Sequence, residues 1–160
     1  MEFIKLDTLA LNIANKNDRK ALEFIQKLCH DESIKKRFQG IMGGLFNNPN
    51  KELLGYAFLV SFNEEYIGYI RVGNFNKDEK SVYLRAAIDQ AQRGHSFGKT
   101  LLNEITEYIF QNHPEVESIR LKIASDNIPS LMTANACNYE WLRDDFYIKY
   151  NPYLHKQVKR

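Results

Sequence analysis

The stretch 88–98, Ile-Asp-Gln-Ala-Gln-Arg-Gly-His-Ser-Phe-Gly, has the residue types of an anion-binding turn. Gly94 and Gly98 stand on either side of Ser96, basic residues flank the loop, and no acidic residue follows it before Glu104. A short loop that presents unpaired backbone N–H groups at a helix start suits phosphate, because the positive end of the helix dipole lies behind them. The alternative is an ordinary glycine-containing turn capped by its serine.

The residues around this loop predict a strand before it and a helix after it. The alternating apolar residues of the strand are Val82, Leu84, Ala86 and Ile88. The apolar residues spaced as on one side of a helix are Phe97, Leu101, Leu102, Ile105, Tyr108 and Ile109. The loop matches neither a nucleotide P-loop nor a dinucleotide-binding fingerprint, because the glycine spacing of both is absent.

A second candidate motif follows a second strand with alternating apolar residues, 118–123. After it comes Asn127-Ile-Pro-Ser130, and then Asn138-Tyr139. Asn127 has the donor and acceptor groups to hold an amide-containing ligand, but it would also serve as the N-cap of a helix that begins near Pro129. Residue type alone leaves both roles open.

The segment 93–102 resembles the acyl-CoA pyrophosphate loop of the GNAT superfamily of N-acyltransferases, whose pattern is Gln/Arg-x-x-Gly-x-Gly/Ala. Arg93 and Gly98 fall on the first and last positions, and Ser96 replaces the middle glycine. The second motif is similar to the family's Asn-x-x-Ala/Ser, and Asn138-Tyr139 stands where the family has Gly-Phe. The agreement in order and spacing of both motifs is more specific than either alone.

The resemblance implies an α+β fold, an α/β three-layer sandwich. One domain would have a mixed, mostly antiparallel seven-stranded sheet, flanked by about four helices and splayed between its fourth and fifth strands. Strands are expected over 2–9, 55–62, 66–73, 81–88 and 118–123, with two more within 139–150. Helices are expected over 18–29, 32–41, 129–136 and the segment after the loop. This domain would cover 1–152, and a basic tail 153–160.

By the same resemblance, acetyl-CoA would be the acyl donor and the strand end before the loop would pair with its pantetheine arm. The residues implied in binding it are Ala86, Ala87, Ile88, Arg93, Gly94, His95, Ser96, Phe97, Gly98, Lys99, Asn127 and Ser130. Ser96 places a side chain where the family's glycine allows the closest approach, and its hydroxyl could add a hydrogen bond.

The acid and base are less well marked than the cofactor site. Ala134 stands where many members carry a tyrosine as general acid, so Ser130 or Tyr139 would have to substitute, or the thiolate would leave unaided. Tyr83 stands where several relatives place a glutamate base. Ser130, Tyr139 and Tyr83 are therefore the catalytic candidates.

Composition bounds the remaining possibilities. The 160 residues, 44% hydrophobic and with a net charge of +2, indicate one domain and give no overall charge for nucleic acid. We expect a cytoplasmic protein, because the sequence shows neither a signal peptide nor a membrane span. Cys29 and Cys137 do not read as a disulfide framework, and the scattered histidines predict no metal site.

The sequence therefore predicts an N-acetyltransferase that transfers acetyl directly to a primary amine in a ternary complex. Family features lean towards a protein N-terminus, with a small amine such as a polyamine or aminoglycoside close behind. The alternative is a non-catalytic acyl-CoA-binding or regulatory module of the same fold. Acetyl-CoA and an amine are the expected partners, without nucleic acid or membrane, and a homodimer is compatible with the family.

Overall fold

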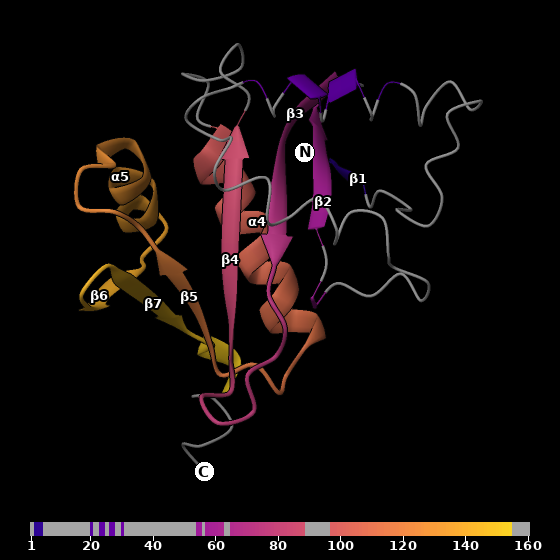
Figure 1. Ribbon diagram of the computed structural model, residues 1–160. Coiled ribbons are helices and arrows are strands. Elements are labelled where there is room, and N and C mark those ends of the chain that lie inside the picture. The colour runs from indigo at the N-terminus through magenta and orange to yellow at the C-terminus, as the bar shows by residue number, and fades with distance from the viewer. Residues whose placement is uncertain are drawn as a thin grey trace. The chain divides into compact units, whose positions relative to one another are not determined.

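A computed structural model describes residues 2–4, 20, 23–24, 26–27, 30, 54–55, 57–62, 65–88 and 97–154. The chain forms two compact units (Figure 1), residues 1–72 with 86–95, and residues 73–85 with 96–160. Its strands and the helices α4 and α5 confirm the predicted α+β class, with mixed and mostly antiparallel strand pairing.

The first unit contains β1 (Glu2–Ile4), β2 (Ala57–Phe62) and β3 (Glu65–Val72), paired antiparallel in that order. Leu59 and Ile70 are as buried as their neighbours, so β2 and β3 have buried residues on both faces. Within the expected helix 18–29, the described positions between 20 and 27 are helical. The expected helix 32–41 lies outside the described residues.

The second unit contains most of β4 (Ser81–Ile88), then α4 (Phe97–Asn112), β5 (Ser118–Lys122), α5 (Ile128–Ala136), β6 (Glu140–Arg143) and β7 (Phe146–Tyr150). Its strand order is β4-β5-β7-β6, with β4 parallel to β5 and the other pairs antiparallel. These bounds lie within one or two residues of those predicted. Tyr153, the first residue of the expected tail, has its hydroxyl hydrogen-bonded to Glu107 of α4.

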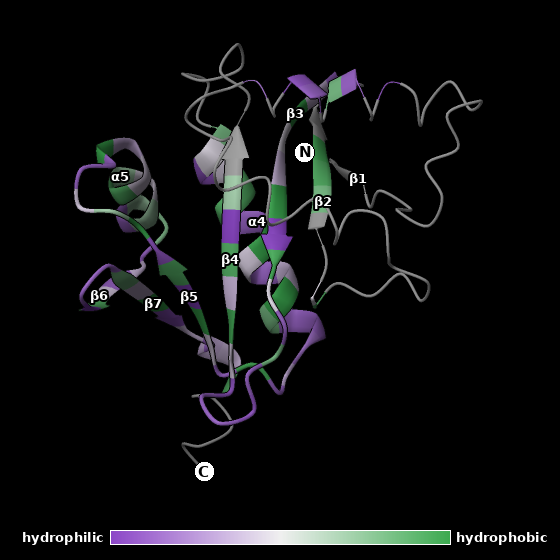
Figure 2. Ribbon diagram, viewed as in Figure 1, coloured by the Kyte–Doolittle hydropathy of each residue, from purple (hydrophilic) through white to green (hydrophobic). Residues whose placement is uncertain are grey.

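The period of each element explains the core of the second unit. Figure 2 shows hydrophobic residues interspersed with hydrophilic ones along α4 and β4. The buried apolar side chains come from α4 (Leu101, Leu102, Ile105, Ile109 and Phe110), from β4 (Val82 and Leu84) and from β5 (Ile119 and Leu121). Because alternate residues of a strand share a face, Tyr83 and Arg120 lie on the opposite face of the same two strands.

The pairing of β4 with β5 stops before β4 does. The parallel ladder runs from Ser81 opposite Ser118 to Leu84 opposite Leu121, whereas β4 continues to Ile88. Among the described residues, the backbone of β4 beyond Leu84 therefore has no partner in β5. β5 itself ends at Lys122, one residue beyond the ladder, so the predicted splay stays a prediction.

Candidate active site

The first turn of α4 is the part of the expected phosphate loop that the structure describes. α4 begins at Phe97 and has no acidic residue in its first turn. Lys99 is exposed there, so both the helix dipole and a side chain are positive at this end. Arg93, Gly94, His95 and Ser96 lie outside the described residues.

Gly98 is in helical conformation, so no positive φ angle requires a glycine there. A Cβ atom placed on it would be 3.8 Å from both Cγ2 and Oγ1 of Thr133 in α5, which is ordinary van der Waals contact. Within the described part of the chain, neither backbone geometry nor packing explains the glycine. Close approach of a ligand is one physical reason for a glycine at a helix start.

Asn127 caps α5, as one of its two predicted roles requires. Its Oδ1 accepts a hydrogen bond from the backbone N–H of Ser130 at 3.4 Å, and Pro129 stands at the start of the helix. The cap uses only the amide oxygen. In the described part of the chain no acceptor is found for its Nδ2 group, so this half-buried side chain can cap the helix and still donate to a ligand.

Gly98 and Asn127 are far apart in the sequence, but α4 packs against α5, and a Cβ on Gly98 would touch Thr133, one turn beyond Ser130. Cys137, at the end of α5, supplies a second link, because its thiol donates to the carbonyl oxygen of Lys99 at 3.5 Å. Burial raises the pKa of this thiol, although Lys149 and Lys99 act in the opposite direction.

Tyr139 lies in the core rather than at an open surface. Its hydroxyl is 2.6 Å from Oγ1 of Thr106, in the middle of α4, and only 3% of the residue is exposed. Burial raises the pKa of this phenol well above its usual value, with the Thr106 hydrogen bond acting in the opposite direction. A proton donor to a leaving thiolate must reach the substrate, and this placement does not favour that role.

Asn138, the residue before Tyr139, stands at the family's glycine position and has a φ angle of 63°. The N–H of Tyr139 donates to the carbonyl of Ala134, and the N–H of Asn138 donates to that of Asn135. This pair of bonds forms a Schellman motif that ends α5. Asparagine replaces glycine here because it tolerates the left-handed conformation better than most residues.

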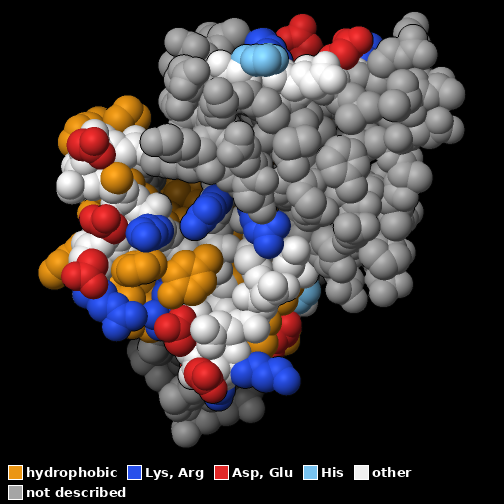
Figure 3. Space-filling view, viewed as in Figure 1, with side chains coloured by type: hydrophobic (Ala, Val, Ile, Leu, Met, Phe, Trp, Pro, Cys, Tyr) orange, Lys and Arg blue, Asp and Glu red, His pale blue; other side chains and the backbone are white. Residues whose placement is uncertain are grey.

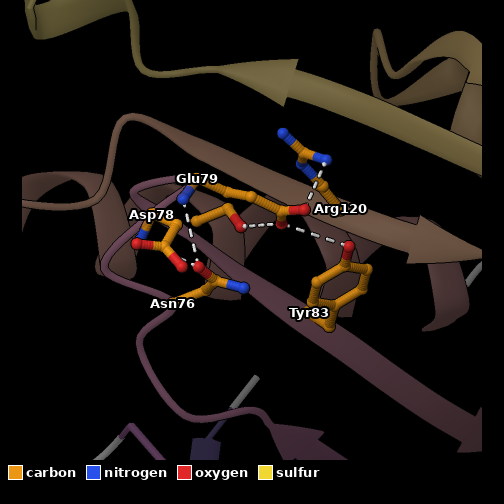
Figure 4. Close-up of polar contacts among 6 residues, drawn as sticks. Asn76, Asp78, Glu79, Tyr83 and Arg120 are labelled. Atoms are coloured by element: carbon orange, nitrogen blue, oxygen red, sulfur yellow. Dashed lines mark hydrogen bonds and ion pairs between the residues drawn. The ribbon is translucent and has the colours of Figure 1, made fainter.

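Tyr83, the third catalytic candidate, belongs to a polar cluster on β4 and β5 (Figure 4). Its hydroxyl donates to Oε2 of Glu79 at 3.3 Å, and Ser81 donates to the same oxygen at 3.0 Å. Arg120 approaches the other oxygen of Glu79, with Nη1 at 3.4 Å. No sequence pattern marks Glu79 or Arg120. Glu79 is one of several charged residues in a turn, and an arginine between two apolar residues is normal for a strand with one polar face.

The other expected cofactor residues lie at the end of β4. Ala86 is exposed, while for Ala87 and Ile88 only the strand conformation is described. No group of three metal-ligating side chains occurs among the residues that the structure describes. None of the described helices is long and apolar enough to cross a membrane.

A family model described as an acetyltransferase (GNAT) domain matches residues 8–155. The chain belongs to the GNAT family. This confirms the family inferred from the two motifs and makes the protein an enzyme of the acetyltransferase class. Among curated proteins, none matches the sequence significantly.

Solved structures of GNAT acetyltransferases have the same fold. A point mutant of spermidine N-acetyltransferase SpeG from Vibrio cholerae gives a TM-score of 0.64 at 17% identity, covering 87% of this chain and 94% of that chain. A dodecameric structure of the same Vibrio cholerae enzyme gives 0.61 at 18%, covering 86% and 93%. Aminoglycoside acetyltransferase AAC(6')-Ib, in complex with coenzyme A and kanamycin, gives 0.54 at 15%, covering 65% and 70%.

Proposed function

We propose that this GNAT protein transfers an acetyl group from acetyl-CoA directly to a primary amine, a protein N-terminus or a small amine, in a ternary complex. The amine nitrogen attacks the thioester carbonyl carbon, the carbon–sulfur bond breaks, and an N–H proton ends on the released thiolate. The products are an N-acetylated amine and free coenzyme A. Much of the rate can come from holding the two reactants together.

The observation that carries this proposal is the contact between the first turn of α4 and α5. It brings a helix start without acidic residues near a helix whose cap, Asn127, has an amide donor with no acceptor among the described residues. A pyrophosphate needs the first feature and an amide-containing arm suits the second. Gly98 supports the same assignment, because nothing else in the described structure requires a glycine there.

The similar structures support the class of both reactants. AAC(6')-Ib is seen with coenzyme A and kanamycin, and SpeG is named a spermidine N-acetyltransferase. Because these enzymes are only 15% and 17% identical to this chain, their acceptors do not identify its acceptor, which depends on its own residues. The dodecameric SpeG structure also supports self-association, and we keep a homodimer and a cytoplasmic location as expectations.

In this proposal the backbone of Ala86, Ala87 and Ile88 pairs with the pantetheine arm, because β4 continues beyond its ladder with β5. The loop 93–96 and the α4 start bind the pyrophosphate. The hydroxyls of Ser130 and Tyr83 remain candidates for moving protons, since Tyr83 donates to Glu79 and keeps its own lone pairs to accept.

Calorimetry of acetyl-CoA binding tests the cofactor site. Gly98→Glu places a carboxylate at the helix start and should weaken binding about 100-fold or more, since it opposes the phosphates. Asn103→Glu adds the same charge at an exposed position further along α4 and should bind like the wild type. Folded wild-type protein that binds no acetyl-CoA, or equal weakening by both variants, would contradict the proposal.

Turnover tests the second half of the proposal. Release of free thiol is followed with acetyl-CoA and a panel of primary amines, and acetylation of the amine is verified by mass. Binding without turnover on any amine would contradict amine acetylation while leaving the cofactor site intact.

A further inference from the structure

The polar face of the second unit carries a group of exposed cations, Arg85, Lys122 and Arg143, on neighbouring strands. Lys122 lies opposite Phe146, which lies opposite Arg143, so these three residues form a row across β5, β7 and β6. Arg85 lies on the same face, because it is two residues after Tyr83 in β4. We call Arg85, Lys122, Arg143 and Phe146 the basic face.

Charge is strongly uneven on these strands. β4, β5, β6 and β7 together contain five basic residues and one acidic residue, Glu140. Figure 3 shows basic side chains beside hydrophobic ones over this part of the molecule, with acidic side chains around them. A whole-chain net charge of +2 conceals this local excess.

The three cations have no ion-pair partner among the described residues. The ammonium of Lys122 lies 5.8 Å from the centre of the Phe146 ring, which is a cation–π contact and leaves its N–H groups available. By contrast, Lys80 pairs with Glu117, and Arg120 pairs with Glu79. The basic face therefore has charge that an anionic ligand would complement.

Arg120 lies beside the basic face but does not belong to it. It lies one row from Lys122 on the same face, and its side chain is only 14% exposed. Its Nε atom is buried and has no hydrogen-bond partner in the part of the chain that the structure describes. An atom without exposed surface cannot be reached by a ligand on this face, so Arg120 is left out of the basic face.

We propose that the basic face selects amine acceptors that carry carboxylates. This rests on the proposed acetyl transfer and names the acceptor class for it. Carboxylates match guanidinium and ammonium groups in charge and geometry, whereas a polycationic amine would be repelled. The chain itself links the two functions, because Arg85 immediately precedes Ala86, the first β4 residue assigned to acetyl-CoA.

Three tripeptides of equal length test the class of acceptor: Ala-Asp-Asp, its neutral counterpart Ala-Asn-Asn, and the basic Ala-Lys-Lys. We expect the largest kcat/KM for the acidic peptide and the smallest for the basic one. The double variant Lys122→Ala with Arg143→Ala should lower kcat/KM for the acidic peptide about tenfold, as expected for two exposed charge contacts. The double variant should leave unchanged both the kcat/KM for the neutral peptide and the KM for acetyl-CoA.

Lys77→Ala is the matched control, because Lys77 is an exposed lysine in the turn before β4 and lies outside the basic face. A basic peptide that is acetylated as well as the acidic one would overturn the selectivity and leave acetyl transfer intact. A raised KM for acetyl-CoA in the double variant would overturn it too, because the cations would then serve the cofactor. If no tripeptide is acetylated, their binding to the complex of the protein with acetyl-CoA is measured by calorimetry. Equal affinity for all three peptides, or no binding of any, would then overturn the selectivity.

Discussion

Helix α4 meets the segment that follows β5 at two places that differ in tightness. At its first turn, a Cβ atom on Gly98 would meet Thr133 at an ordinary 3.8 Å. In its middle, Thr106 and Tyr139 form a buried hydrogen bond of 2.6 Å. The first place has only an ordinary van der Waals distance beside a positive helix end, and the second is a short hydrogen bond inside the core. A substitution at the first place should therefore change binding, and one at the second should change stability.

The largest effect is expected when the same carboxylate is introduced at both places. Thr106→Glu would bury a charge beside Tyr139, and we expect the free energy of unfolding to fall by about 4 kcal/mol or more. Gly98→Glu should leave that free energy within about 1 kcal/mol of the wild type, since a carboxylate at a helix start interacts favourably with the dipole. Urea denaturation measures both, and equal losses would refute the contrast.

Tyr139→Phe separates a structural from a catalytic role. The substitution keeps the ring but leaves the buried hydroxyl of Thr106 unpaired, so we expect a loss of about 1–2 kcal/mol in the free energy of unfolding. The kcat for acetyl transfer, measured where the variant is folded, should not change. A fall in kcat of about 100-fold without loss of stability would restore Tyr139 as a catalytic acid.

The raised pKa of Tyr139 adds a pH dependence to the same contact. Because the folded state holds the phenol proton more tightly than the unfolded state, this stability is fully present below about pH 10 and is lost as the pH rises through the folded pKa. Alkaline unfolding of the wild type should therefore steepen above about pH 10. Tyr139→Phe should lack that contribution, and identical alkaline profiles would count against it.

The sequence predicts the second unit well because period and turn chemistry act locally there. The alternation in β4 and β5 and the helical spacing of α4 give the elements within a residue or two. The buried position of Tyr139 could not be predicted in the same way. A tyrosine next to a turn is equally compatible with a site and with a core, and only its contact with Thr106, 33 residues away, decides between them.

The basic face could not be predicted for a similar reason. Each of its cations is an ordinary outward residue of its own strand, and they come together only through the register of β4, β5, β7 and β6. In the first unit, Leu59 and Ile70 are as buried as their neighbours, whereas a strand with one buried face would alternate between buried and exposed residues. Tertiary packing, which no single strand encodes, accounts for both differences.

Two substitutions at Asn127 separate its role as the cap of α5 from its proposed role in binding acetyl-CoA near the first turn of α4. Asn127→Ser keeps an oxygen for the cap but removes the Nδ2 donor, so acetyl-CoA binding should weaken about fivefold while stability is kept. Asn127→Ala loses both, and we expect a further cost of about 1 kcal/mol in the free energy of unfolding. Calorimetry and urea denaturation distinguish them. Unchanged acetyl-CoA binding by the serine variant would leave Asn127 as a cap only.

The smallest effect is expected at Asn138, which ends α5 and positions Tyr139 for its contact with Thr106. At φ 63° a Cβ atom is strained, so Asn138→Ala should lower the free energy of unfolding by about 1 kcal/mol. Asn138→Gly removes that strain at some cost in unfolded-state entropy and should lie within about 0.5 kcal/mol of the wild type. Urea denaturation measures the free energy of unfolding of both variants, and the difference between them reports the backbone strain at this position. If alanine were tolerated as well as glycine, the left-handed turn would not be what positions Tyr139 for its contact with Thr106.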